Sequence, residues 1–260
     1  MRVGAIYIAP VKSLALQQVE RARLTKRGLE GDREFFLVSD RDRLFTMREY
    51  GPLATVRASY LYDTGRLRFE FPDGRAYEAE PAPGAPFTAR FFGEYDVEAF
   101  ECPGPWDEAL KQFTGMPVRL ARATPRRSAV DALPVSLLSD ASLRALRDAS
   151  GEATFEVRRF RPNIYIEGAE RLHQEDEWLG RTVRAGAAEI MVRMRDPRCV
   201  MTTLSPDTGE RDFNTLRMIT AYRSDQPKEV NFGVYGTVET EGDITAGDEI
   251  AAADPATPTP

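Results

Sequence analysis

The amino-acid sequence predicts a mixed α/β protein that is rich in β-strand and has two domains. Three observations lead to this fold class. Many short strand-like segments fill the first hundred residues, two helix-like segments follow, and strand-like segments return from residue 158 onward. The chain has 260 residues, 42% of them hydrophobic, and this length is comfortable for two domains. We expect one domain over residues 1–104, a second over residues 105–251, and a disordered tail over residues 252–260.

The first domain is predicted from segments rich in β-branched and aromatic residues. Residues 34–38 and 54–60 have this composition. Residues 66–71 alternate strictly between charged and apolar types and run into Pro72-Asp73-Gly74, which indicates a hairpin. Strands this short and closely spaced are typical of a barrel or a sandwich.

Helices are predicted where capping residues flank an apolar stripe. Pro105 and Gly115 bracket a helix whose stripe is formed by Trp106, Ala109, Leu110 and Phe113, which we interpret as core. A second helix starts near residue 139 or 140 and stops at Gly151. A short helix is expected over Thr215–Tyr222.

The second domain contains further strands and ends in a tail. Strands are expected over residues 164–166, 182–184, 189–194, 234–238 and 248–250, and residues 205–209 form a loop. The last eight residues have too little apolar content to pack.

Composition excludes several classes of function. Lys and Arg number 35 and Asp and Glu 41, so the net charge is −6. This balance argues against a general role on nucleic acid, which needs a basic face. No apolar run approaches the roughly 20 residues that cross a bilayer, and the N-terminus does not resemble a signal or transit peptide. We therefore expect a cytoplasmic protein that acts without a membrane.

The supply of soft metal ligands is small. The chain has two cysteines, Cys102 and Cys199, and one histidine, His173. A disulfide framework and an iron–sulfur cluster need more cysteines, and a His/Cys zinc site needs about three or four such ligands. If a transition metal is bound, something other than the protein must supply most of its ligands.

Cys199 is the first candidate for chemistry. Three arginines, Arg193, Arg195 and Arg198, lie within six residues of its thiol, and adjacent positive charge favours a thiolate. Pro197 ends the preceding strand, which places Cys199 at a strand terminus or in a loop. The alternative is a buried cysteine that acts as a small hydrophobic residue. Cys102 lacks basic neighbours and is interpreted as structural.

Two arginine- and lysine-containing segments are candidates for anion binding. In residues 158–163, Arg161 and Asn163 precede a strand, where arginine suits phosphate or carboxylate; surface ion pairing is the alternative. Lys12, Ser13 and Arg33 could hold an anionic group, although each taken alone is a turn with a solvated charge.

The remaining polar candidates have structural interpretations. His173 lies in a polar run and is interpreted as a solvated loop histidine. Asp32, Asp196 and Asp207 are interpreted as partners for neighbouring arginine or backbone groups.

The order of these segments resembles the two-domain MOSC proteins. The resemblance rests on segments spread along the chain: Pro10-Val11-Lys12-Ser13, Gly28-Leu29 with Asp32-Arg33, Phe160-Arg161-Pro162-Asn163, Arg198-Cys199 with Thr202-Thr203, and Pro206-Asp207-Thr208-Gly209. It covers residues 2–250, nearly the whole chain. The most similar group is the amidoxime-reducing component family. The resemblance implies an N-terminal β-barrel-like domain followed by a MOSC β-barrel domain with a few short helices.

The resemblance also implies a cofactor and its site. The family binds a pyranopterin molybdenum cofactor whose dithiolene supplies two sulfur ligands, and one protein cysteine completes the metal site. Cys199 matches that cysteine. The family positions that bind the pterin and its phosphate are occupied here by Lys12, Ser13, Arg33, Arg161 and Asn163. Arg198 and Thr202 lie on either side of the metal-binding cysteine.

The family's reaction implies the reduction of small N-hydroxylated compounds, such as amidoximes, at the metal. Electrons are then expected from a separate flavin reductase, ferredoxin-like or cytochrome-like protein. Two alternatives stay open: a carrier or sulfur-transfer module that holds the cofactor without turnover, and a metal-free thiol protein in which Cys199 reacts directly.

Overall fold

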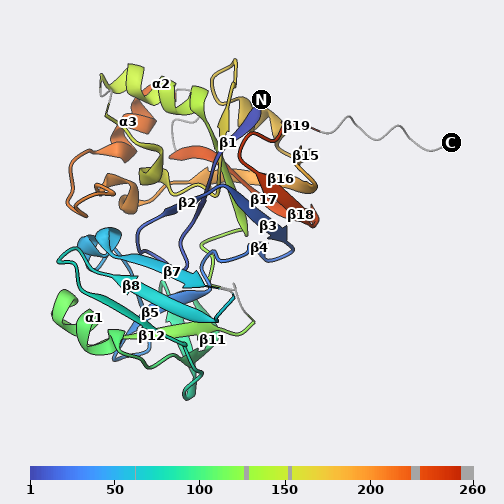
Figure 1. The fold of residues 1–260 in the computed structure, drawn as a ribbon. Helices are drawn as coiled ribbons and strands as arrows, with labels where there is room; N and C mark the ends of the chain where they lie inside the picture. The colour runs from blue at the N-terminus through green and yellow to red at the C-terminus, as the bar shows by residue number, and fades with distance from the viewer. Residues whose placement is uncertain (62, 126–128, 152–153, 224–228, 253–260) are drawn as a thin grey trace.

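The computed structural model describes residues 1–61, 63–125, 129–151, 154–223 and 229–252, and shows a β-rich protein with three α-helices in these ranges. The predicted mixed, β-rich fold class is confirmed. Figure 1 shows two halves. One, here called the N-terminal half, contains α1 and the strands between residues 35 and 123; the other contains α2, α3 and a large sheet that includes the first strand of the chain. None of the helices in the described residues is long and apolar enough to cross a bilayer. The expected tail lies almost entirely outside the described residues.

The N-terminal half is built from two antiparallel sheets. The five-stranded sheet has the order β10 (Pro86–Phe91), β11 (Tyr95–Glu101), β12 (Val118–Ala123), β5 (Phe35–Ser39) and β6 (Leu44–Phe45). The three-stranded sheet is β7 (Arg57–Leu61), β8 (Arg66–Glu70) and β9 (Ala76–Ala79). The hairpin predicted around Asp73-Gly74 joins β8 to β9.

Helix α1 (Trp106–Thr114) closes the N-terminal core. It ends at Gly115, which adopts a left-handed φ of 69° that favours glycine. Trp106 is fully buried and its ring lies 5.4 Å from that of Phe69, while Leu110 packs in the same cluster. The predicted helix and its core stripe are therefore confirmed.

The other half is organised by an eight-stranded sheet to which the N-terminus contributes. Its order is β19 (Ile250–Ala252), β15 (Thr182–Ala185), β16 (Ala188–Pro197), β17 (Asn231–Thr240), β13 (Val135–Ser139), β14 (Ile164–Glu167), β1 (Arg2–Ile8) and β2 (Gln17–Val19). The pair β13–β14 is parallel and the other pairs are antiparallel. A small sheet of β18 (Gly242–Thr245), β3 (Arg21–Thr25) and β4 (Gly28–Leu29) lies beside it.

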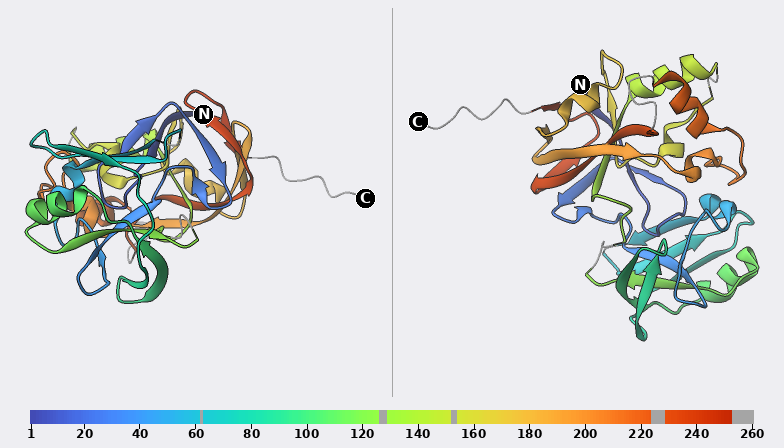
Figure 2. Two further views of the ribbon diagram at one scale, coloured as in Figure 1. Left: turned by 60° about the horizontal axis from the view of Figure 1, so that its bottom comes forward. Right: turned by 180° about the vertical axis from the view of Figure 1, so that it is seen from behind.

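Two predicted helices pack on this sheet. Helix α2 (Asp140–Ser150) is capped by the Ser139 hydroxyl, which accepts from the Ser142 amide at 3.2 Å, and it ends at Gly151 with φ 71°. Helix α3 (Thr215–Tyr222) lies beside α2, as both views of the chain show (Figures 1 and 2). Four 3-10 helices complete the described elements: η1 (Gly51–Thr55), η2 (Val157–Phe160), η3 (Gln174–Trp178) and η4 (Val200–Thr203).

The two halves touch tightly at a pair of glycines. A Cβ atom built on Gly209, in the loop after η4, would lie 2.2 Å from the backbone of Gly51 in η1. Only glycine fits at this crossing. This close contact between Gly51 and Gly209 holds the loop after Cys199 against the N-terminal half. Both halves therefore contribute to the space around the Cys199 thiol.

Candidate functional site

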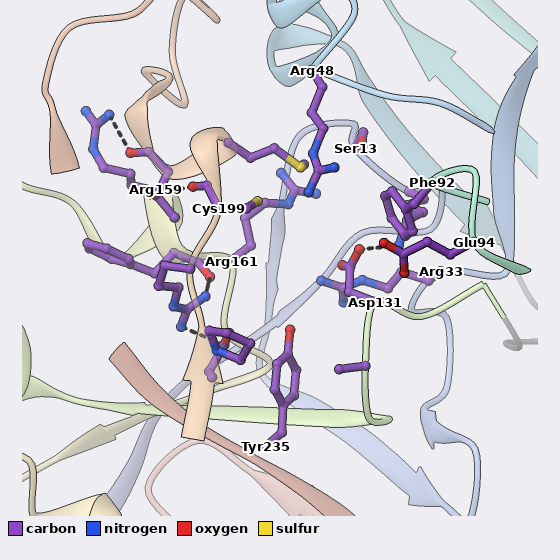
Figure 3. Close-up of a pocket in the computed structure, with 18 residues that line it drawn as sticks. Ser13, Arg33, Arg48, Phe92, Glu94, Asp131, Arg159, Arg161, Cys199 and Tyr235 are labelled. Atoms are coloured by element: carbon purple, nitrogen blue, oxygen red, sulfur yellow. Dashed lines mark hydrogen bonds and ion pairs between the residues drawn. The ribbon is translucent and has the colours of Figure 1, made fainter. Parts of the chain in front are cut away.

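A cavity of about 270 Å³ lies where the two halves meet (Figure 3). Among the described residues, six basic and three acidic side chains line it, together with Cys199 and a few apolar groups. The lining residues are Lys12, Ser13, Arg33, Arg48, Phe92, Glu94, Asp131, Ala132, Arg159, Phe160, Arg161, Asp196, Pro197, Arg198, Cys199, Met201, Thr202 and Tyr235. The excess of basic groups makes the cavity suited to an anionic ligand.

Cys199 stands at the point where strand β16 gives way to η4. It is partly exposed, and its carbonyl accepts from the Thr202 amide at 3.1 Å and from the Thr202 hydroxyl at 3.0 Å. These two bonds fix the backbone that carries the thiol. The prediction of a strand terminus for Cys199 is confirmed, whereas Cys102 is buried in the N-terminal core and burial raises the pKa of its thiol to about 11.

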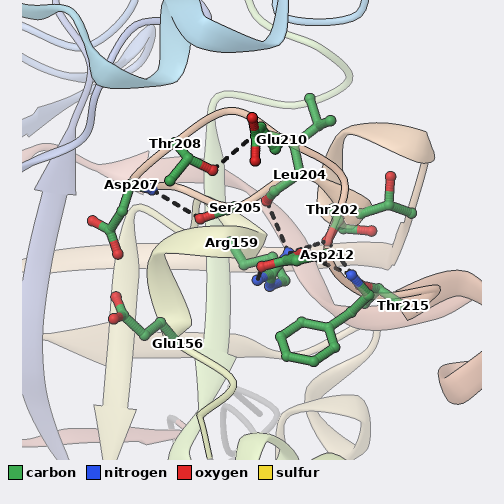
Figure 4. Close-up of polar contacts among 12 residues, drawn as sticks. Glu156, Arg159, Thr202, Leu204, Ser205, Asp207, Thr208, Glu210, Asp212 and Thr215 are labelled. Atoms are coloured by element: carbon green, nitrogen blue, oxygen red, sulfur yellow. Dashed lines mark hydrogen bonds and ion pairs between the residues drawn. The ribbon is translucent and has the colours of Figure 1, made fainter.

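Arg159 fastens the loop that follows this turn (Figure 4). Its guanidinium donates to both carboxylate oxygens of Asp212, at 2.7 and 2.6 Å, and to the carbonyl of Leu204 at 2.9 Å. The Thr215 hydroxyl, at the start of α3, donates to the Thr202 carbonyl at 2.8 Å. The buried charge is therefore paired, and the η4 carbonyls are satisfied by two separate elements.

Lys12 is a buried cation on one wall of the cavity. Its ammonium donates to the Asp131 carboxylate at 2.8 Å and to the Ala129 carbonyl at 2.9 Å. Burial lowers the pKa of Lys12. Burial acts to raise the pKa of Asp131, but the charges of Lys12 and Arg33 outweigh it and hold that pKa at about 2. Asp131 is therefore ionised at neutral pH.

Arg33 and Arg161 continue this wall. Arg33 forms a close ion pair with Asp32, while Arg161 donates to the Leu14 carbonyl at 2.7 Å. Burial lowers the pKa of Arg161 to about 10, and the nearby charge of Arg33 adds to this effect. Arg33 is buried and Arg161 partly buried, and two cations held close together in this way are costly unless a negative group lies near them.

Several residues with a strained backbone conformation line the same cavity. Six non-glycine residues in the described chain have positive φ, and four of them line the cavity: Ser13, Arg33, Phe92 and Arg161. The Ser13 hydroxyl is buried and has no hydrogen-bond partner within the part of the chain that the structure describes. Strained backbone and an unsatisfied buried hydroxyl are features of ligand-binding sites, where a bound molecule completes the contacts.

Asn163 lies behind the wall rather than in it. Its side-chain amide donates to Asp32 at 2.9 Å, and its carbonyl oxygen accepts from the Ser136 amide at 3.1 Å. Asp32 also accepts from the Ala9 amide at 2.7 Å and pairs with Arg33. Asn163 therefore orients the Asp32 carboxylate, which in turn orients the Arg33 guanidinium.

A second buried ion pair lies on the strand side of the cavity. Arg198 donates to the carbonyls of Phe160 and Phe232, at 2.8 and 2.7 Å, and lies 2.7 Å from Asp196. Burial raises the pKa of Asp196 to about 7, with Arg198 acting in the opposite direction. Burial also raises the pKa of Tyr235, whose ring points into the cavity (Figure 3). Asp196 therefore holds its proton in part at neutral pH.

The structure brings most of the predicted site residues together. Lys12, Ser13, Arg33, Arg161, Arg198, Cys199 and Thr202 line one cavity, and Asn163 supports it. The solvated-charge interpretation of Lys12, Ser13 and Arg33 is wrong, because all three are more than nine-tenths buried. His173 is also not a solvated histidine: it is half-buried, and its ring nitrogens lie 3.1 Å from the Ser142 hydroxyl and 2.9 Å from that of Tyr222.

The arginines nearest to Cys199 in sequence mostly point elsewhere. Arg193 pairs with Glu239 and Arg195 with Asp176, and neither lines the cavity. The run at 158–161 is likewise divided: Arg158 forms surface ion pairs, as the alternative interpretation has it, while Arg161 faces the cavity. The sequence did not reveal seven further cavity residues, which lie in segments without a recognisable pattern: Arg48, Phe92, Glu94, Asp131, Ala132, Met201 and Tyr235.

The fold and the cavity define a class of protein: β-rich, in two parts, with a basic cavity around one thiol between them. Residues 1–103 match the MOSC N-terminal beta barrel domain, and residues 124–251 match the MOSC domain. The chain therefore belongs to the MOSC proteins that carry this N-terminal barrel domain. The predicted family and the predicted barrel fold are confirmed.

Curated relatives match almost the whole chain. The mitochondrial amidoxime reducing component 2 of Homo sapiens is 27% identical over 95% of this chain and 82% of its own length. The mitochondrial amidoxime-reducing component 1 of Mus musculus is 26% identical over 95% of this chain and 81% of its own. A molybdenum cofactor sulfurase of Caenorhabditis elegans is 25% identical over 88% of this chain and 32% of its own length. Among solved structures, the YUAD protein of Bacillus subtilis aligns with a TM-score of 0.45 at 13% identity, over 96% of this chain and 93% of that one.

Proposed function

We propose that this protein is a molybdenum-cofactor-dependent oxidoreductase that reduces small N-hydroxylated compounds, with Cys199 as its protein ligand to the metal. Membership of the MOSC proteins supports a role linked to this cofactor. The amidoxime reducing components, which match 95% of the chain, support the class of reaction.

The observation that carries the proposal is the pairing of one thiol with a basic wall in a single cavity. A pyranopterin cofactor ends in a phosphate, which binds best to cations and hydroxyl donors. Lys12 and Arg33 are buried cations, Arg161 is a partly buried one, and the Ser13 hydroxyl lacks a hydrogen-bond partner among the described residues. These donors suit the phosphate, and Cys199 offers the soft sulfur ligand that such a metal takes. The residues present therefore fit the cofactor.

When bound, the cofactor would supply a two-electron redox centre for the reduction of an N–OH group. The residues of the chain bind and orient it. Lys12, Ser13, Arg33 and Arg161 would hold the phosphate and pterin. Asn163 fixes Arg33 through Asp32.

The cavity also contains a group that can supply a proton to the proposed reduction. Reduction of R–NH–OH to R–NH2 and water consumes two electrons and two protons. Asp196 faces the cavity with a pKa of about 7 and can hold one proton at neutral pH on its carboxyl group. The electrons would come from a separate donor protein.

The test is turnover of benzamidoxime to benzamidine by purified, molybdenum-containing protein with reduced methyl viologen as the electron donor. We expect turnover by the wild type and by a Cys102→Ser variant, whose changed thiol lies in the N-terminal core. We expect none by Cys199→Ala. Wild-type protein with bound pterin but without turnover would contradict the proposal and favour a cofactor carrier. Reactivity of Cys199 with peroxide in a pterin-free protein would favour the metal-free thiol protein.

A further inference from the structure

Arg48 reaches the cavity from a rigid turn of the N-terminal half. The turn follows β6, and its backbone is fixed by Thr46, whose amide and hydroxyl both donate to the Glu49 carboxylate at 2.8 Å. The Thr46 hydroxyl also accepts from the Arg48 amide at 3.1 Å, and Met47 is buried in the N-terminal core. With both neighbours held, the Arg48 side chain projects across the interface toward the side of Cys199 (Figure 3).

The pairing of Arg48 differs from that of the other cations in the cavity. Each of the others is held by a carboxylate or a carbonyl: Lys12 by Asp131, Arg33 by Asp32, Arg159 by Asp212, Arg198 by Asp196, and Arg161 by the Leu14 carbonyl. Within the described part of the chain, Arg48 forms no ion pair. Its guanidinium lies over the Phe92 ring, 5.0 Å from the ring centre, and lines the same cavity as Cys199.

The Phe92 ring supports the Arg48 guanidinium. It lies in the turn between β10 and β11 with a φ of 53°, a strained value for an aromatic residue. The strain places the ring inside the cavity, where it also contacts the Lys12 ammonium at 5.7 Å. A guanidinium on an aromatic ring keeps its hydrogen-bond donors free for a ligand.

Partial burial acts to lower the pKa of Arg48, but the interactions with Cys199 and Asp131 outweigh it, so the pKa is raised. A guanidinium stays protonated in proteins, so Arg48 carries a full positive charge in the cavity that holds the thiol. An exposed, charged donor at the cavity, without a carboxylate partner, is suited to an anionic group on an entering molecule.

We infer that Arg48 binds a carboxylate group of the substrate, so that the preferred N-hydroxylated substrates are acids rather than neutral or cationic compounds. The identity of the substrate rests on the proposed function, whereas the anion site beside Cys199 does not. The two can therefore be tested separately.

The first experiment uses the metal-free protein in a Cys102→Ser background and measures alkylation of Cys199. Iodoacetate is an anion and iodoacetamide is neutral, and both react with the thiolate. The ratio of their rate constants therefore cancels any change in the thiolate fraction. We expect Arg48→Gln to lower this ratio by about threefold to fivefold, the effect of one partly exposed charge. Arg48→Lys should keep most of the ratio.

The matched control is Arg41→Gln, which removes the same charge from an exposed residue outside the cavity. It should leave the ratio unchanged. The inference is overturned if Arg48→Gln leaves the ratio as it is in the wild type, or if Arg41→Gln lowers it equally.

The second experiment compares benzamidoxime with 4-carboxybenzamidoxime on the molybdenum-containing protein. We expect the wild type to favour the carboxylated substrate in kcat/KM, and Arg48→Gln to lose that preference through KM. An equal preference in the two proteins would overturn the substrate assignment. If the alkylation ratio changes as expected and neither compound is reduced, the anion site stands and the proposed function fails.

Discussion

The substitution Arg159→Met tests whether the loop after Cys199 depends on one buried arginine. The Arg159 side chain is 3% exposed and pairs with Asp212, which is 34% exposed. Removing one partner of a buried ion pair costs roughly 3–5 kcal/mol. Because water reaches Asp212 and can solvate it once it is unpaired, we expect the lower value, about 3 kcal/mol.

The free energy of unfolding is measured in urea by tryptophan fluorescence, since Trp106 lies in one half and Trp178 in the other. For a chain of this size, a loss of about 3 kcal/mol corresponds to a decrease in Tm of roughly 6–12 °C. The control is Arg158→Gln, because the neighbouring Arg158 is 35% exposed and pairs with Glu156 and Asp207 at the surface. It should cost at most about 1 kcal/mol. Equal losses in the two variants would refute the assigned role of Arg159.

Three further substitutions test separate features. The pKa of Asp196 is raised to about 7 by burial, against about 3.9 in an unfolded chain, so wild-type stability should fall as pH rises from about 4 to about 7, by up to about 4 kcal/mol. Asp196→Asn should flatten this dependence in urea unfolding at several pH values; an unchanged slope would contradict the assignment. Ser13→Ala removes a buried hydroxyl that has no partner among the described residues, so it should lower pterin content while the free energy of unfolding stays within about 1 kcal/mol of the wild type. Full pterin content would show that this hydroxyl binds nothing. Gly209→Ala should lower stability by about 2 kcal/mol or more, because its Cβ would overlap the backbone of Gly51. Gly180→Ala, with a similar φ and open space around it, is the control, and equal effects would exclude the overlap as the cause.

Features encoded by nearby residues could be predicted from the sequence. The cap at Ser139 and the glycine at Gly151 define α2, and Pro197 ends β16 just before Cys199. Each of these depends on contacts within one or two turns of the chain, which residue type alone largely determines. The segment order that identified the family is likewise visible without a structure.

Features that depend on distant contacts could not be predicted. The pairing of β1 with β14 joins residues more than 150 positions apart, and it buries Lys12 and Ser13 just beyond the strand. Arg48 follows a turn of the N-terminal half and has no sequence pattern that connects it to Cys199. Arg193 and Arg195 are nearer to Cys199 in sequence, but Arg193 pairs with Glu239 at the surface and Arg195 with the largely buried Asp176. Charge near a residue in sequence is a poor guide here to charge near it in space, because the β16–β17 register shifts between Val192 and Met194 and between Arg195 and Pro197, and the strand ends before Cys199.

The most direct test of the central claim is molybdenum and pterin analysis of protein expressed in a molybdenum-replete host. Wild type, Cys199→Ser and Cys102→Ser would be compared. We expect near-stoichiometric molybdenum and pterin in the wild type and in Cys102→Ser, and loss of molybdenum in Cys199→Ser. Folded wild-type protein from the same host without either component, or full molybdenum retention by Cys199→Ser, would contradict the account.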